Sequence, residues 1–200
     1  MPCVGLPVNK GALSVKPNEI LDCLELNPII AAIRDDGWEA ALRSPAQLLF
    51  YLSADLTTVC RRITQAHEAG KILLVHMDLA DGIGKDKVGL QYLADCGVDG
   101  IISTRGQIIR TAKELGLLTV QRFFALDSQG MDSIQEMLRS TNPHLMEIMP
   151  GVIPKAIQRF AAGSIPVIAG GLIETKQEVT AALGIGATAI STGCRELWYL

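Results

Sequence analysis

Short apolar runs alternate with amphipathic segments along the chain from about residue 28 onward. The apolar runs predict eight strands, at residues 28–33, 46–52, 71–78, 100–103, 117–124, 144–149, 166–170 and 187–192. The amphipathic segments predict helices at residues 38–43, 55–69, 85–96, 106–115, 131–140, 153–162, 175–183 and 195–199. Continuous apolar strands that alternate with helices are typical of a parallel sheet covered by helices. Eight such repeats predict an α/β fold, a compact (β/α)8 barrel of the TIM type.

The pattern also predicts how the chain is divided. Residues 27–200 are expected to form a single barrel domain, because 200 residues of which 48% are hydrophobic suit one core. Residues 1–26 form a separate lead-in, in which residues 19–26 are expected to be a helix that closes the bottom of the barrel. An open doubly wound sheet is less favoured, since no Gly-x-Gly-x-x-Gly motif follows the first strand.

Composition indicates the binding partners, cysteine chemistry and cellular location to expect. The net charge of −3 argues against a generally basic, nucleic-acid-coating surface, although it leaves a local basic patch open. The five cysteines are widely separated and form no Cys-x-x-Cys pair, so we expect reduced thiols and neither a disulfide framework nor a metal site. The chain shows no secretion signal and no apolar run long enough to span a membrane, and we expect a cytoplasmic location.

The C-terminal third carries the clearest chemical signal. One predicted strand ends in Gly170 and Gly171, and the next ends in Thr192 and Gly193. Glycine lets backbone amides approach an anion closely, and the last two strand-to-helix loops of a β/α barrel are a common phosphate site. These loops predict a small phosphorylated ligand.

Strand alternation predicts which polar side chains point into the barrel mouth. In the third strand the alternate apolar residues are expected to face the helices, which turns His76 and Asp78 toward the barrel axis. The same reasoning turns Glu147 inward in the sixth strand, and Thr119 and Gln121 inward in the fifth. Such groups could bind the hydroxyls of a polyol phosphate, whereas His76 and Asp78 could instead simply hydrogen-bond to each other.

Two arginines lie at the rim where ligand loops are expected. Arg105 directly follows the fourth strand, and Arg122 lies near the end of the fifth. A guanidinium group there could clamp a phosphate or contact a nucleic-acid backbone. The structural alternative is a salt bridge to a nearby carboxylate, such as Asp78, Asp81, Asp127 or Glu147.

Several segments together resemble the bacterial glycerol-3-phosphate-responsive antiterminators. They are NPIIAAIR at residues 27–34, VHMDL at 75–79, GIISTR at 100–105, QRFFALDS at 121–128, EIMPG at 147–151 and PVIAGG at 166–171. The resemblance extends over residues 27–198 and depends most on the Ser-Thr-Arg, Gln-Arg and Glu-x-x-Pro-Gly pieces. It does not cover the lead-in.

The resemblance implies a regulator of glycerol uptake operons and not an enzyme. Glycerol 3-phosphate would be the effector, no cofactor or metal would be needed, and the liganded protein would bind the leader of the operon mRNA. The phosphate would lie on Gly170, Gly171, Thr192 and Gly193, and the hydroxyls on His76, Asp78, Gln121 and Glu147. Arg105 and Arg122 would serve either ligand or RNA. Whether the chain forms a homo-oligomer stays open.

The main alternative is an isomerase or hydrolase of a phosphosugar or polyol phosphate on the same barrel. Glu147 and His76 could supply the base and the electrophile of an isomerase. A Schiff-base aldolase is disfavoured because the one strand lysine, Lys71, lies at the opposite end of its strand. A third class, a barrel that only binds a partner, predicts no response to phosphate esters.

Overall fold

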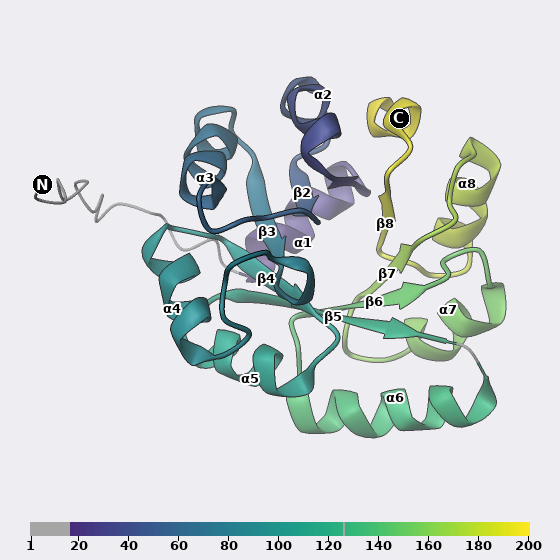
Figure 1. Ribbon diagram of the computed structural model, residues 1–200. Helices are drawn as coiled ribbons and strands as arrows, with labels where there is room; N and C mark the ends of the chain where they lie inside the picture. The colour runs from purple at the N-terminus through teal and green to yellow at the C-terminus, as the bar shows by residue number, and fades with distance from the viewer. Residues whose placement is uncertain (1–16, 126) are drawn as a thin grey trace, which may run out of the picture.

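The computed structural model describes residues 17–125 and 127–200, which fold into a closed barrel of eight parallel strands (Figure 1). The strands are β1 (Ile29–Ile33), β2 (Leu48–Tyr51), β3 (Ile72–His76), β4 (Gly100–Ser103), β5 (Leu118–Phe124), β6 (Leu145–Met149), β7 (Val167–Gly170) and β8 (Ala189–Thr192). Each strand pairs with the next in sequence, and β1 pairs with β8 to close the barrel. The predicted fold class is therefore confirmed.

Helices surround the barrel (Figure 1). They are α2 (Trp38–Arg43), α3 (Val59–Glu68), α4 (Lys87–Asp95), α5 (Gly106–Glu114), α6 (Ser128–Thr141), α7 (Pro154–Ala161) and α8 (Lys176–Gly184). Short 3-10 helices η1 (Asp35–Gly37) and η2 (Met77–Leu79) follow β1 and β3. The last predicted helix is instead the 3-10 helix η3 (Arg195–Tyr199), which follows β8.

Side-chain caps mark where several of these helices begin. The Asp86 carboxylate accepts a hydrogen bond from the Gly89 amide at 3.0 Å, at the start of α4. Thr175 and Glu178 form a reciprocal capping box at the start of α8. Such caps satisfy amides that the first helical turn leaves without partners, and they fix the residue at which each loop ends and its helix begins.

The core has two layers, separated by the barrel wall. Outward-facing strand residues and the helices form the larger layer. Inward-facing strand residues fill the barrel axis, together with Ile20 and Leu24 of helix α1 (Pro17–Leu26). Both side chains are buried among the inward-facing residues, so α1 closes the bottom of the barrel, as the sequence predicted.

The predicted facing of β5 is wrong. Leu118 and Val120 belong to the inner layer, whereas the Thr119 and Gln121 side chains bond to residues outside the barrel wall. Both faces of a barrel strand are buried, so apolar residues do not identify the face that the helices cover. The alternation also places Arg122 on the inner face.

The prediction that the cysteines are all reduced thiols is wrong for one pair. Cys60 in α3 and Cys96, the residue after α4, form a disulfide with their Cα atoms 5.0 Å apart. They lie 36 residues apart in sequence, and the pair joins α3 to the end of α4. Cys23 and Cys194 are free thiols, and Cys3 lies outside the described residues.

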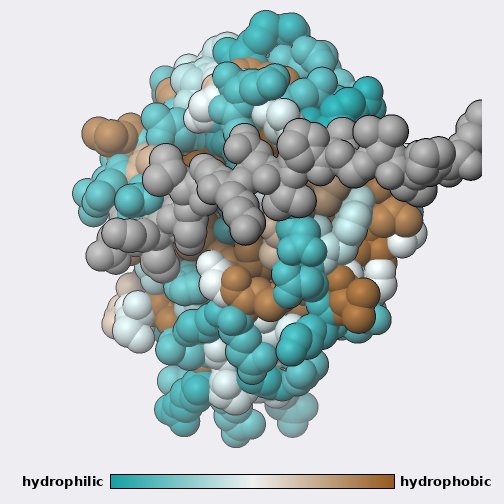
Figure 2. All heavy atoms as spheres, turned by 90° about the vertical axis from the view of Figure 1, so that its left-hand side faces the viewer, coloured by the Kyte–Doolittle hydropathy of each residue, from teal (hydrophilic) through white to brown (hydrophobic). Residues whose placement is uncertain are grey.

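The surface carries both polar and apolar residues. On the face shown in Figure 2, hydrophilic residues cover most of the upper and lower parts, and apolar side chains gather between them. Among the helices of the described residues, none has both the length and the apolar character needed to cross a bilayer.

Candidate functional site

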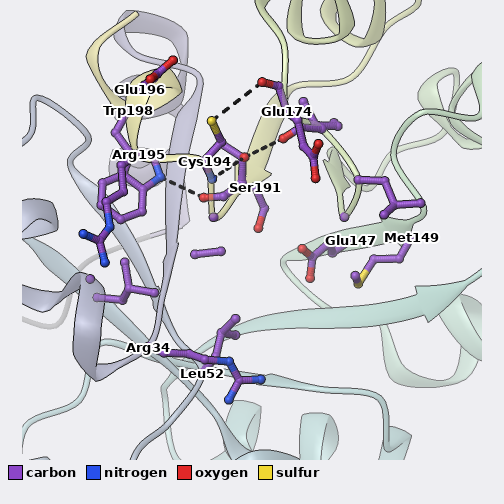
Figure 3. Close-up of a pocket in the computed structure, with 18 of the residues that line it drawn as sticks. Arg34, Leu52, Glu147, Met149, Glu174, Ser191, Cys194, Arg195, Glu196 and Trp198 are labelled. Atoms are coloured by element: carbon purple, nitrogen blue, oxygen red, sulfur yellow. Dashed lines mark hydrogen bonds between the residues drawn. The ribbon is translucent and has the colours of Figure 1, made fainter.

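A cavity of about 740 Å³ opens at the carboxyl ends of the strands (Figure 3). Its wall comes from the ends of β1, β5 and β6 and from the loops that follow β7 and β8. Of the residues proposed from sequence, Arg122, Glu147, Gly171, Thr192 and Gly193 line this cavity. The predicted loops after β7 and β8 thus meet at one pocket, at the end of the barrel where such folds place their sites.

The loop after β7 has a conformation that suits glycine. Gly171 has a φ of +74°, in the left-handed region that side chains other than glycine rarely adopt. Leu172 follows with a φ of +60° and is exposed. The Gly151 amide donates to the carbonyl oxygens of Gly170 at 2.6 Å and Gly171 at 3.1 Å, which fixes this loop against the loop after β6.

Thr192 connects the two glycine loops. Its hydroxyl donates to the Ile173 carbonyl at 2.7 Å and accepts from the Cys194 amide at 3.0 Å. The indole of the buried Trp198 donates to the Thr192 carbonyl at 2.8 Å. Because its polar groups are already engaged, Thr192 holds the loops in place, and the contact surface that it offers a ligand is small.

A buried ion pair forms part of the cavity wall. Arg122 Nε donates to Glu147 Oε2 at 2.6 Å, with the two side chains 9% and 1% exposed. Gly170 does not line the cavity, but a Cβ atom there would overlap the Glu147 carboxylate. Gly170 is therefore required for a different reason than the sequence suggested, namely to make room for Glu147.

A second polar cluster lies at the ends of β3 and β4. The Asp78 carboxylate accepts hydrogen bonds from the Ser103 hydroxyl at 2.8 Å and the Thr104 amide at 2.7 Å. Arg105 lies 3.6 Å from Asp78, so the salt bridge considered from sequence is present. Burial raises the pKa of Asp78, but hydrogen bonds from Thr104 and Ser103 outweigh it and hold the pKa below its usual value.

His76 points inward, as predicted, but it is closed off from the cavity. The side chain is buried, and its Nδ1 atom has no hydrogen-bond partner among the described residues. Burial, with the nearby positive charge of Arg122, lowers the pKa of His76 to about 4. The ring is therefore neutral at physiological pH and needs a small polar partner such as water.

Gln121 lies outside the barrel wall, contrary to its predicted position. Its side-chain oxygen accepts from the Thr141 hydroxyl at 2.6 Å, and its amide nitrogen donates to the Met137 sulfur at 3.0 Å. Both partners belong to α6. Gln121 thus links β5 to a helix and does not reach the mouth of the barrel.

Sequence reasoning missed several residues of the wall. Arg34 directly follows β1, and Ser191 is the inward-facing residue next to the end of β8. Strand position was a sufficient signal for both. Arg195 and Trp198 line the cavity from η3 and carried no such signal, because they lie in a helix beyond the end of β8.

Metal-dependent and Schiff-base chemistry each require particular side chains at the barrel mouth. Within residues 17–125 and 127–200, no cluster of three or more His, Cys, Asp or Glu side chains is placed to hold a metal ion. None of the eight described strands contains a lysine that could form a Schiff base. The wall carries carboxylates, guanidinium groups and glycine backbone, which are groups suited to a small anionic, hydroxylated molecule.

Comparisons with known proteins identify relatives of this chain. A family model described as "Glycerol-3-phosphate responsive antiterminator" matches residues 29–198. A solved structure of the glycerol uptake operon antiterminator regulatory protein from Listeria monocytogenes is 33% identical, with a TM-score of 0.81 over 86% of this chain and 95% of its own. An antiterminator-related protein from Thermotoga maritima is 32% identical, with a TM-score of 0.76 over 85% and 96%.

Two further similarities extend these findings. The chain is 31% identical to the "Uncharacterized protein YgcP" of Escherichia coli K12 over 90% of this chain and 96% of that protein. A deoxyribose phosphate aldolase from Aeropyrum pernix has a TM-score of 0.63 over 90% of this chain and 89% of its own. That enzyme is only 14% identical, so the likeness concerns the barrel fold alone.

Proposed function

Because the chain belongs to the family of glycerol-3-phosphate responsive antiterminators, we propose that it is a non-catalytic sensor of glycerol 3-phosphate. The effector binds in the cavity at the barrel mouth, and the liganded protein binds the leader of an operon mRNA. The observation that carries the proposal is the family match over residues 29–198 together with a cavity formed by two glycine loops.

The phosphate group lies against the loops after β7 and β8. The backbone at Gly171 and Gly193 lines the cavity, and neither residue has a side chain to keep an anion away. Thr192 acts through its hydrogen bonds, which hold the two loops at a fixed separation. Backbone amides bind phosphate oxygens well because they are pre-oriented donors that need no counter-charge.

The glycerol hydroxyls lie over the buried ion pair. Arg122 uses Nε for its bond to Glu147, and no other partner of its guanidinium occurs in the described part of the chain. Glu147 uses one carboxylate oxygen for Arg122, which leaves the other as an acceptor. The pair thus offers both a donor and an acceptor, as a hydroxyl group requires.

The remaining sequence-derived residues have supporting roles in this proposal. Neither His76 nor Asp78 lines the cavity, and Asp78 belongs to the second cluster. Asp78 fixes the loop that carries Arg105, whose side chain is 58% exposed and therefore available to the phosphate backbone of RNA. Gln121 lies outside the barrel wall, so it does not contact the ligand in this proposal.

The test combines ligand binding, RNA binding and turnover. Purified protein is titrated with glycerol 3-phosphate in a thermal-shift assay, with glycerol, inorganic phosphate and dihydroxyacetone phosphate as controls. We expect a saturable stabilisation specific to glycerol 3-phosphate, without chemical change of the ligand. In a gel-shift assay, leader RNA of a glycerol operon should bind only when this ligand is present. Turnover of the ligand, lost in Glu147→Gln, would instead establish the enzyme alternative.

A further inference from the structure

One arginine of the cavity has no ionic partner in the protein. Three arginines line the cavity wall: Arg34, Arg122 and Arg195. Arg122 is paired with Glu147 at 2.6 Å, and Arg195 is paired with Asp36 at 3.1 Å. Across residues 17–125 and 127–200, the Arg34 side chain makes no ion pair or hydrogen bond. We propose that Arg34 binds the phosphate group of the ligand, an inference that rests on the proposed function.

The acidic residues next to Arg34 are engaged elsewhere. Asp35 accepts hydrogen bonds from the Tyr51 hydroxyl at 2.7 Å and the Ser53 hydroxyl at 3.2 Å. Asp35 also lies 3.6 Å from Arg62, on the α3 side. Asp36, the next residue, is the partner of Arg195. The positive charge of Arg34 is therefore not neutralised by the two carboxylates that follow it in the chain.

Arg34 lies beside the loop that forms half of the predicted phosphate site. Strands β1 and β8 are paired, with Ala31 opposite Thr192, so the residues after each strand lie next to each other. Gly193 is close to the β1 backbone, since a Cβ atom there would lie 3.6 Å from the Ala32 carbonyl oxygen. Figure 3 shows Arg34 with Leu52 on one side of the cavity and Glu147 with Met149 on another.

The net charge of the cavity wall indicates why an anionic ligand would need Arg34. Four carboxylates line the cavity, Asp36, Glu147, Glu174 and Glu196, against the three arginines. The wall is thus formally negative by one charge, and two of its three cations are already paired. Backbone amides alone would have to hold a phosphate against that field. A planar guanidinium can offer two parallel hydrogen bonds and a full positive charge to the same group.

The experiment compares two arginine variants that change the net charge equally. Arg34→Ala removes the proposed phosphate ligand, and Arg61→Ala removes an exposed arginine of α3 that does not line the cavity. Affinity for glycerol 3-phosphate and for inorganic phosphate is measured by calorimetry at low and high salt. We expect Arg34→Ala to weaken both ligands by about tenfold or more, and Arg61→Ala to leave both unchanged. Arg34→Lys should recover part of the loss.

Each outcome separates the two proposals. Wild-type protein that binds phosphate but not glycerol 3-phosphate would refute the proposed effector, while the phosphate titrations would still test Arg34. Equal affinity of the Arg34→Ala and Arg61→Ala variants for both ligands would overturn the role of Arg34 and leave the effector in place. Salt should weaken wild-type binding more than Arg34→Ala binding, because an exposed charge contributes a screened interaction. Wild-type protein that binds neither anion would overturn both proposals.

Discussion

The buried Arg122–Glu147 pair allows a quantitative test of the site. Replacing Glu147 with Leu leaves a guanidinium that is only about a tenth exposed without a counter-charge. Removing one partner of a buried ion pair typically costs about 3–5 kcal/mol, whereas replacing both with apolar residues of similar volume is often neutral or stabilising. We therefore expect Glu147→Leu and Arg122→Met each to lose about 3–5 kcal/mol. The double variant Arg122→Met, Glu147→Leu should lose much less than the sum.

Urea denaturation and thermal denaturation, both followed by circular dichroism, measure these differences. For a chain of this length, a loss of 3–5 kcal/mol corresponds to a fall in Tm of roughly 6–20 °C. The double variant should fold with a near-native Tm and yet bind no glycerol 3-phosphate, which separates stability from binding. Single variants that lose less than about 1 kcal/mol, or losses that simply add in the double variant, would show that the two charges are not coupled.

Three further predictions follow from particular residues. The fold favours the neutral form of His76, so the free energy of unfolding should be highest above pH 6.5 and fall by up to about 3 kcal/mol as the pH drops toward 4. His76→Gln should remove this pH dependence when urea midpoints are compared across pH. Gly171→Ala should cost about 1–2 kcal/mol through its positive φ, while Gly193→Ala should not; both should weaken ligand binding, and unchanged affinity in both would contradict the phosphate site. Alkylation of the denatured, unreduced protein followed by peptide mapping should label Cys23 and Cys194 but not Cys60 or Cys96, and label on both Cys60 and Cys96 would show that the disulfide is absent.

The fold could be predicted from the sequence because strand and helix signals repeat. Each of the eight apolar runs coincides with a strand, and the short first helix α2 was already apparent in the pattern. The glycine loops were equally accessible, since Gly170 and Gly193 each lie at the end of an apolar run. Whether a residue lies at the end of a strand depends on the neighbouring sequence, so it can be predicted without knowledge of distant contacts.

The facing of side chains was predicted less well, for a physical reason. In β3 and β6 the polar residues, His76 and Glu147, are the inward-facing ones, and the alternation rule succeeded. In β5 both faces of the strand carry polar residues, so alternation alone does not tell whether Gln121 or Arg122 points inward, and the prediction of Gln121 was wrong. The choice depends on the partners across the barrel, Thr141 outside and Glu147 inside. The disulfide was missed for the same reason, because pairing depends on contact between helices.

Arg122 interacts with both Glu147 and His76, and this position affects what the barrel mouth can do. Toward the cavity it is paired with Glu147, and its charge also helps to keep the neighbouring His76 neutral. General base catalysis requires a base within hydrogen-bonding reach of the substrate. His76 is closed off from the cavity, and one Glu147 oxygen is held by Arg122. The groups that line the cavity therefore fit the proposed sensor, which has to hold its ligand in one orientation.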